Sequence, residues 1–200
     1  MSPSELQLDF LKESFNIGVG RGTQVLNTML NSHIQLTVPE LRLINAMENV
    51  EFEEYEGAVA TVNLQFNGAL NGTCRLLLPS DSALKLVNQV MGTSDEIKET
   101  DFDAMSEGVL KEVGNIVLNS VIGVLGNTLE IQLVYSIPAF KSCDAKEIID
   151  GLKRNDEQVG LMTRTHFNIE SMDIHGDILT LFSLDSFSDL LSLIDKSIND

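Results

Sequence analysis

Apolar residues recur at helical spacing in two long stretches of the chain. The first runs from Ser4 to Asn31, with Ser4 as a candidate N-cap, Glu5 in the first turn and no proline before Pro39. The second runs from Ser106 to Asn127. Its most apolar part, 116–125, is typical of a core helix, with a homodimer contact as the alternative. The pattern therefore predicts two long helices, each followed by an extended region that a proline opens.

Short apolar runs bounded by turn residues predict strands. The stretches with this pattern are 41–47, 58–66, 73–78, 158–169 and 177–184. The second and third are joined by the turn-forming segment NGALNG, which indicates a hairpin and an antiparallel sheet. Two short amphipathic stretches, 79–92 and 185–198, predict further helices. Ser80 and Asp81 are candidate N-caps of the first, and Gly92 is its expected end.

The order of these elements recurs along the chain, which indicates an internal repeat. A shift of 99 positions gives eight identities without a gap: Lys12 and Lys111, Glu13 and Glu112, Asn16 and Asn115, Ile17 and Ile116, Val25 and Val124, Leu26 and Leu125, Leu30 and Leu129, and Pro39 and Pro138. We therefore predict an α+β fold made of two pseudo-symmetric α-β-β-β-α halves, residues 1–95 and 96–200. The halves form one domain with an antiparallel sheet.

The charge balance narrows the classes of partner. The formal net charge is −17, with only 13 Lys and Arg residues, which disfavours nucleic acids and anionic membrane surfaces. No stretch approaches twenty consecutive apolar residues, and MSPSELQLDF lacks the features of a signal peptide, so a cytoplasmic location is expected. The acidic segment 48–57 predicts a solvated loop, with partner recognition as the alternative, and 93–103 predicts a linker.

Cysteine and histidine give little support for a metal site. Cys74 and Cys143 are too few for a disulfide framework and lack the spacing of metal ligands, so reduced and mostly buried thiols are expected. His33, His166 and His175 are scattered, so folding would have to gather them around a metal.

Three glycines, Gly18, Gly20 and Gly22, interrupt the first long helix. No strand precedes them, so they do not form a loop that cradles a phosphate. Each costs about 1 kcal/mol of helix propensity relative to alanine, which close packing could offset. At 100° per residue, Gly18 and Gly22 share the apolar face with 11, 25 and 29, which predicts close approach of another helix or the sheet.

Gly20 falls on the opposite, polar face of the same helix. It follows Asp9, Glu13 and Asn16 there, in a stripe that continues to 23 and 27. A carboxylate, a second carboxylate and a carboxamide thus line up beside bare backbone.

The second long helix repeats this stripe with changes. Glu112, Asn115 and Asn119 share one face, and Gly108 stands at the position of Asp9. Val117 and Val121 replace the two glycines of the apolar face, which predicts looser packing there.

Glu and Asn three residues apart are, taken alone, typical of a solvated helix face. Their recurrence in both halves changes this interpretation, because asparagine is a mediocre helix former with no evident structural reason to recur. Each Asn also precedes its proline by the same 23 positions. The structural alternative is that Glu, Asn and Pro simply persist in both halves after an ancestral duplication and have no function.

The motif Asp9-x-x-x-Glu13-x-x-Asn16, followed after twenty-two residues by Pro39, resembles the signature of the CheC, CheX and FliY chemotaxis phosphatases. The stretch LKEVGNIVLNSVIGVL is similar to the second signature helix of CheC, and the length and duplication favour the CheC-like branch. The resemblance implies hydrolysis of the aspartyl phosphate of a CheY-type response regulator.

The same resemblance assigns the site residues. It implies one site at Glu13 and Asn16 and a second at Glu112 and Asn115, with Asp9, Pro39 and Pro138 in supporting positions. Helix geometry, independently of the resemblance, adds Gly20 as a supporting position. The signature has Asp or Ser where Gly108 stands, so the second site departs from it.

The expected mechanism needs no cofactor of the chain's own, because the regulator supplies Mg²⁺. Asn16 would orient the attacking water, Glu13 would dock an ammonium group of the regulator, and Gly20 would leave room for a loop of that partner. Two alternatives remain. One is a non-catalytic adaptor that binds CheD or a response regulator, and the other is a metal-dependent hydrolase.

Overall fold

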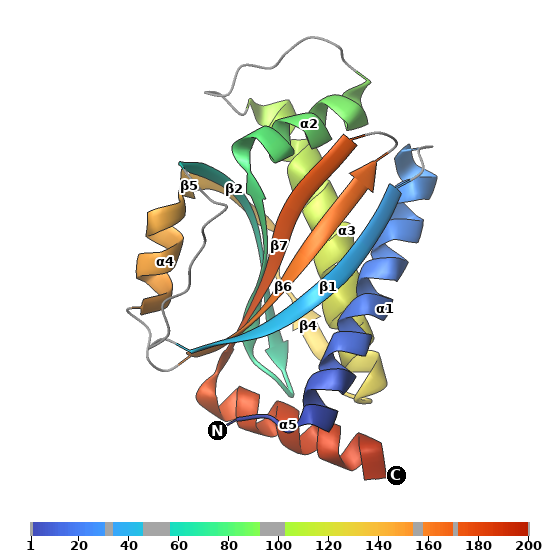
Figure 1. Ribbon diagram of the computed structural model, residues 1–200, viewed down its shortest axis with the longest axis vertical. Coiled ribbons are helices and arrows are strands. Elements are labelled where there is room, and N and C mark those ends of the chain that lie inside the picture. Colours follow the sequence, from blue (N-terminus) through green and yellow to red (C-terminus); the bar gives the residue numbers. More distant parts are fainter. Residues whose placement is uncertain are drawn as a thin grey trace.

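The computed structural model describes residues 2–30, 34–45, 57–92, 103–153, 158–169 and 172–199. The elements in chain order are α1 (Glu5–Leu30), β1 (Ile34–Asn45), β2 (Ala58–Gly68), β3 (Gly72–Pro79), α2 (Ser80–Met91), α3 (Ala104–Thr128), β4 (Leu133–Tyr135), β5 (Ala139–Asp144), α4 (Ala145–Lys153), β6 (Gln158–Ile169), β7 (Met172–Ser183) and α5 (Leu184–Asn199). Figure 1 shows them as one curved sheet with helices around it. The predicted α+β class is confirmed.

All strand pairs of the sheet are antiparallel, and seven strands take part in the order β1-β6-β7-β3-β2-β4, with β5 also paired to β2. At each edge of the sheet, the outer strand pairs with a strand from a distant part of the chain. An N-terminal strand, β1, pairs with β6, and a C-terminal strand, β5, pairs with β2. The expected boundary between residues 95 and 96 and most of both acidic segments lie outside the described ranges, so those three interpretations stay predictions.

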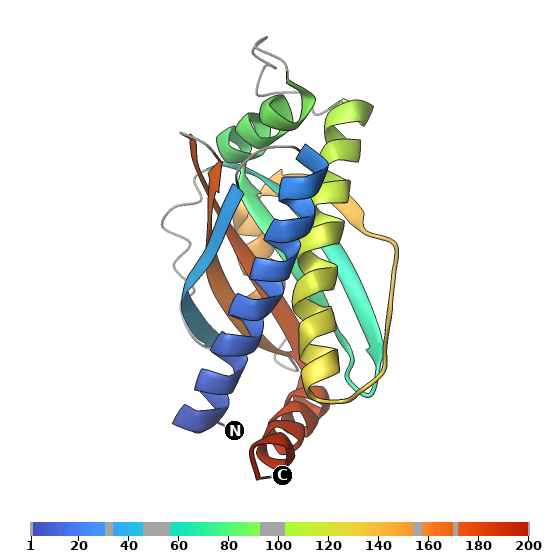
Figure 2. The same ribbon diagram turned by 90° about the vertical axis from the view of Figure 1, so that its right-hand side faces the viewer.

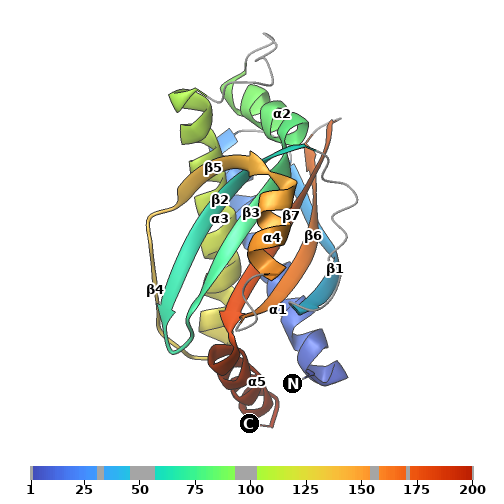
Figure 3. The same ribbon diagram turned by 90° about the vertical axis from the view of Figure 1, so that its left-hand side faces the viewer.

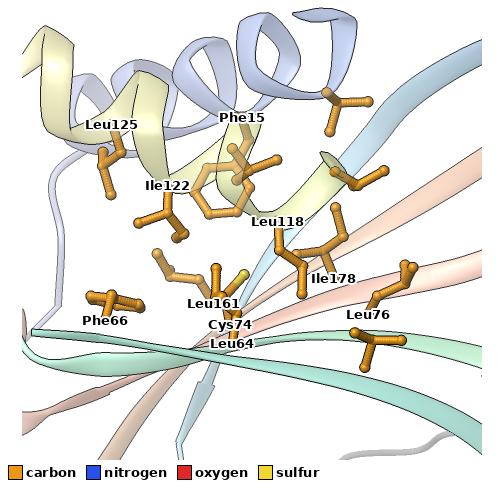
Figure 4. Close-up of a cluster of buried hydrophobic side chains, with 14 of the residues drawn as sticks. Phe15, Leu64, Phe66, Cys74, Leu76, Leu118, Ile122, Leu125, Leu161 and Ile178 are labelled. Atoms are coloured by element: carbon orange, nitrogen blue, oxygen red, sulfur yellow. The ribbon is translucent and has the colours of Figure 1, made fainter. Parts of the chain in front are cut away.

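The helices cover the two faces of the sheet unequally. α1 and α3 lie side by side and antiparallel on one face (Figure 2), whereas the short α4 lies over part of the other face (Figure 3). The main core fills the space between the first face and the two long helices, where Phe15, Leu118 and Ile122 approach Leu64 and Phe66 (Figure 4).

Six residues of the stretch 116–125 are at most 3% exposed, so its prediction as core is confirmed: Val117, Leu118, Val121, Ile122, Val124 and Leu125. By length and composition α3 could also cross a membrane, but half of its most apolar window is buried within the fold.

The N-terminus of α1 begins with a reciprocal cap. The backbone N–H of Gln7 donates to Ser4 Oγ at 3.2 Å, and the backbone N–H of Ser4 donates to Gln7 Oε1 at 2.8 Å. Gln7 Nε2 also donates to Leu191 O and Asp195 Oδ1 of α5. The predicted role of Ser4 is confirmed, and the cap also fixes the start of α1 against the last helix.

α1 and α3 interlock through glycine on one helix and valine on the other. A Cβ at Gly18 would lie 2.6 Å from Val121 Cα, and a Cβ at Gly22 would lie 3.3 Å from Val117 Cα. The predicted close approach at the two glycines is confirmed. The expectation of looser packing at the valines was wrong, because the valines occupy the space that the glycines leave.

The apolar face of α1 does not remain covered to its end. Val25 is 50% exposed and Met29 is 44% exposed, although both share the direction of Gly18 and Gly22. Periodicity gives the direction of a buried face but does not say how far along the helix a neighbour extends.

Two local predictions for α2 and α4 differ from the structure. Pro79 is the N-cap of α2 and no side chain caps it, because Ser80 Oγ donates to Ala58 O at 2.8 Å and Asp81 pairs with Lys85. Ser80 and Asp81 were therefore wrong as caps, whereas Gly92 ends the helix in the left-handed conformation as expected. α4 was not predicted at all.

Candidate functional site

The Asn16 stripe, which comprises Asp9, Glu13, Asn16 and Gly20, faces away from the core. α1 buries the other side of its surface, including Leu11 and Phe15 at 0% exposure. Asp9, Glu13 and Gly20 are exposed, and Asn16 is partly exposed. The structure thus presents the two carboxylates and the carboxamide together on one outward face, as the helical spacing predicted.

The polar side chains of this stripe have no hydrogen-bond partner within the described part of the chain. Within the described part of the chain, the side chains of Asp9, Glu13 and Asn16 make no hydrogen bond or ion pair. The Asn16 carboxamide therefore keeps both its donor and its acceptor capacity. No atom lies within 4 Å of the position that a Cβ would take at Gly20, so the surface next to Asn16 is open.

The Asn115 stripe on α3 comprises Gly108, Glu112, Asn115 and Asn119. Glu112 and Gly108 are exposed, and the two asparagines are partly exposed. Asn119 Nδ2 donates a hydrogen bond to Asn115 Oδ1. Asn119 is the counterpart of Gly20 under the shift of 99 positions, so the carboxamide that is unpartnered in α1 is engaged in α3. The sequence placed Asn119 on this face but did not reveal the bond.

The two stripes form separate sites. Because Gly18 lies against Val121 and Gly22 against Val117, Asn16 and Asn115 are offset by about eight residues, or roughly 12 Å along the antiparallel helix axes. The fold therefore does not gather the four predicted site residues into one pocket. Each Glu and Asn pair stands on its own helix.

Both signature prolines lie in the extended segment that follows their helix. Pro39 is within β1, where the register with β6 shifts between Thr37 and Glu40, a place where a strand tolerates a residue without an N–H. Pro138 immediately precedes β5 and is partly buried. Their supporting role stays a prediction.

Among the described residues, Cys74 is a titratable group away from the stripes. Cys74 is fully buried, and burial raises the pKa of its thiol to about 12, which leaves it unreactive at neutral pH. Within the described ranges, no three His, Cys, Asp or Glu residues come close enough to hold a metal ion.

Comparison with known proteins finds similarity to chemotaxis proteins. The family model described as "Chemotaxis phosphatase CheX" matches residues 60–148, a range that includes Glu112 and Asn115 but not Glu13 and Asn16. The chain is 33% identical over 138 residues to the CheY-P phosphatase CheC of Bacillus subtilis (strain 168). That alignment covers 67% of this chain and 65% of CheC, so slightly less than two thirds of the relative is matched.

Several solved structures share the fold, among them those of FliY and CheX. Thermotoga maritima FliY superimposes with a TM-score of 0.78 at 21% identity, covering 98% of this chain and 100% of FliY. CheX in the CheX-CheY-BeF3-Mg²⁺ complex from Borrelia burgdorferi superimposes with a TM-score of 0.57 at 17% identity, covering 86% of this chain and 97% of CheX.

Proposed function

Because this chain belongs to the CheC/CheX/FliY family of chemotaxis phosphatases, we propose that it hydrolyses the aspartyl phosphate of a CheY-type response regulator in the cytoplasm. The observation that carries this proposal is the outward Asn16 stripe, in which a carboxylate and an unpartnered carboxamide lie one turn apart. The name of the B. subtilis relative, a CheY-P phosphatase, and the solved complex of CheX with CheY support the choice of substrate.

The proposed role of Asn16 is to orient the attacking water. A carboxamide can accept one hydrogen bond from a water molecule and donate another, which fixes the water in line with the phosphorus. Asparagine is neither a useful acid nor a useful base, so we expect positioning and electrostatic stabilisation without a covalent intermediate. The chain contributes no metal of its own in this scheme, since the Mg²⁺ belongs to the regulator.

The proposed role of Glu13 is docking. Its exposed carboxylate lies one turn before Asn16 and can accept a charge-assisted hydrogen bond from an ammonium group at the regulator's site. The bare surface at Gly20 gives a loop of the regulator room to lie against α1. Glu112 and Asn115 form a second site of the same kind on α3.

The experiment that tests the proposal is phosphate release from phosphorylated CheY, measured with and without the protein. A phosphatase accelerates release at substoichiometric concentrations. The alternative function, an adaptor that binds CheD or a regulator through the same exposed helices, changes binding and leaves hydrolysis at the regulator's intrinsic rate. An unchanged rate despite measurable binding would therefore favour the adaptor.

The bond between Asn119 and Asn115 predicts that the second site works below its capacity. Because Asn119 occupies the carbonyl oxygen of Asn115, that oxygen is less able to accept from water. In an Asn16→Ala background, Asn119→Ala is expected to increase phosphate release by about threefold, equivalent to about 0.7 kcal/mol of barrier.

The matched control for this prediction is the same substitution in an Asn115→Ala background. There Asn119→Ala should leave the rate that depends on Asn16 unchanged, because its partner is missing. A decrease in the Asn16→Ala background would instead mean that Asn119 holds Asn115 in its productive orientation.

A further inference from the structure

Residues of β2, β3, β5 and α4 line a polar pocket. It lies on the face of the sheet that carries α4, opposite α1 and α3; Figure 3 shows this arrangement of the elements. Its volume is about 330 Å³, within the range of small-molecule sites in proteins. The pocket is distant from both asparagine stripes because the whole sheet separates them. It is therefore independent of the proposed phosphatase function.

The pocket wall has hydrogen-bond donors without acceptors. Arg75 on β3 is only partly exposed, and its Nε is buried without a hydrogen-bond partner. Gln65 and Thr73, which face each other on β2 and β3, also make no side-chain hydrogen bond among the described residues. A buried donor without an acceptor is unfavourable, and a ligand that supplies an acceptor would relieve this cost.

The charges of the pocket also indicate that a negatively charged acceptor is missing. Lys141 Nζ lies 2.8 Å from Glu147 Oε2, so this cation and this anion satisfy each other, and both side chains are more than half exposed. Arg75 has no such counter-ion among the described residues. Burial lowers the pKa of its guanidinium, which reflects the cost of keeping this cation away from water.

We propose that this pocket binds a small oxyanion, the phosphate or carboxylate group of a soluble molecule, with Arg75 as the charged donor and Gln65 and Thr73 as neutral donors. The planar guanidinium matches two oxygens of either group. The Lys141 and Glu147 pair stands at the rim. There Glu147 opposes the incoming anion and Lys141 favours it.

The native thiol of Cys143 provides a reporter for this binding. Cys143 lines the pocket and is partly exposed, whereas Cys74 is completely buried. A neutral reagent such as N-ethylmaleimide therefore reports the accessibility of Cys143. Burial already raises the pKa of this thiol, and an anion beside Arg75 and Lys141 would raise it further by weakening their stabilisation of the thiolate.

We expect inorganic phosphate or malonate to slow modification of Cys143 by about tenfold at saturation, because the occupied fraction is protected. Sodium chloride at matched ionic strength should have no saturable effect. The probe that protects at the lower concentration identifies the preferred group, phosphate or carboxylate. Absence of saturable protection by either probe would overturn the proposal.

Three variants assign the site to its residues. Arg75→Gln should abolish protection, and Glu147→Gln should lower the half-saturating concentration by about threefold, because the opposing carboxylate is removed. Lys146→Gln is the control. Lys146 lies on α4 next to Glu147, and its replacement makes the same charge change as Arg75→Gln. Because Lys146 is exposed and does not line the pocket, protection should persist.

Equal loss of protection in Lys146→Gln and Arg75→Gln would mean a diffuse charge effect and would overturn the proposal. If Arg75→Gln does not fold, as judged by circular dichroism, saturation in the parent chain and the shift in Glu147→Gln decide the question.

Discussion

Replacing Asn16 with alanine is expected to slow phosphate release from a phosphorylated CheY-type regulator by roughly 30-fold to 1000-fold. In the proposed mechanism, the change removes one polar contact that acts on the water in the transition state, which corresponds to about 2–4 kcal/mol of barrier. The Asn16 side chain makes no hydrogen bond within the described part of the chain, so its truncation leaves no internal donor or acceptor unmatched. The folded state should therefore keep its stability while the rate falls.

Two companion variants separate the roles of the site residues. Asn115→Ala should slow release much less than Asn16→Ala, because its stripe has Gly108 at the signature position of Asp9 and a carbonyl already engaged by Asn119. Glu13→Ala should act mainly on binding, which raises the KM and changes kcat little. A double variant, Asn16→Ala with Asn115→Ala, that is as active as the parent would end the catalytic interpretation.

Replacing Gly18 with alanine is expected to lower the free energy of unfolding by about 2 kcal/mol, although alanine is the better helix former. The new Cβ would lie 2.6 Å from Val121 Cα and 3.1 Å from Ser120 O, and both are backbone atoms that no side-chain rotation can move. The two long helices must therefore separate. The measurement is equilibrium unfolding in urea, read from the midpoint at constant slope.

Gly20→Ala is the matched control, two residues further along the same helix. No atom lies within 4 Å of its new Cβ, so it should raise the free energy of unfolding by up to about 1 kcal/mol through helix propensity. Equal effects of the two substitutions would show that the contact between α1 and α3 does not depend on glycine.

The parts of the fold that the sequence predicted are those determined by local rules. The 3.6-residue period located α1 and α3, and it placed Glu13, Asn16 and Gly20 on one outward face. The serine at the start of α1 and Gly92 at the end of α2 were recognised from the chemistry of helix ends. The hairpin of β2 and β3 followed from its turn residues.

The parts that the sequence did not predict depend on distant partners or on a weak local signal. No pattern within one stretch says that β1 pairs with β6 or that Val117 and Val121 fill the space at Gly22 and Gly18. α4 did carry a signal. Asp144 Oδ1 accepts a hydrogen bond from the Lys146 backbone N–H, at the start of a short amphipathic stretch. A repeat of α-β-β-β-α units has no place for a helix at this point, so the repeat does not predict it.

The pairing of β1 with a strand far along the chain has a consequence during biosynthesis. β1 leaves the ribosome early, but its only neighbour in the described sheet, β6, is made roughly 120 residues later, a delay of about 6–24 s at 5–20 residues per second. Over that interval the nascent chain carries an unpaired strand. We therefore expect slow folding after translation and reliance on chaperones that shield such segments.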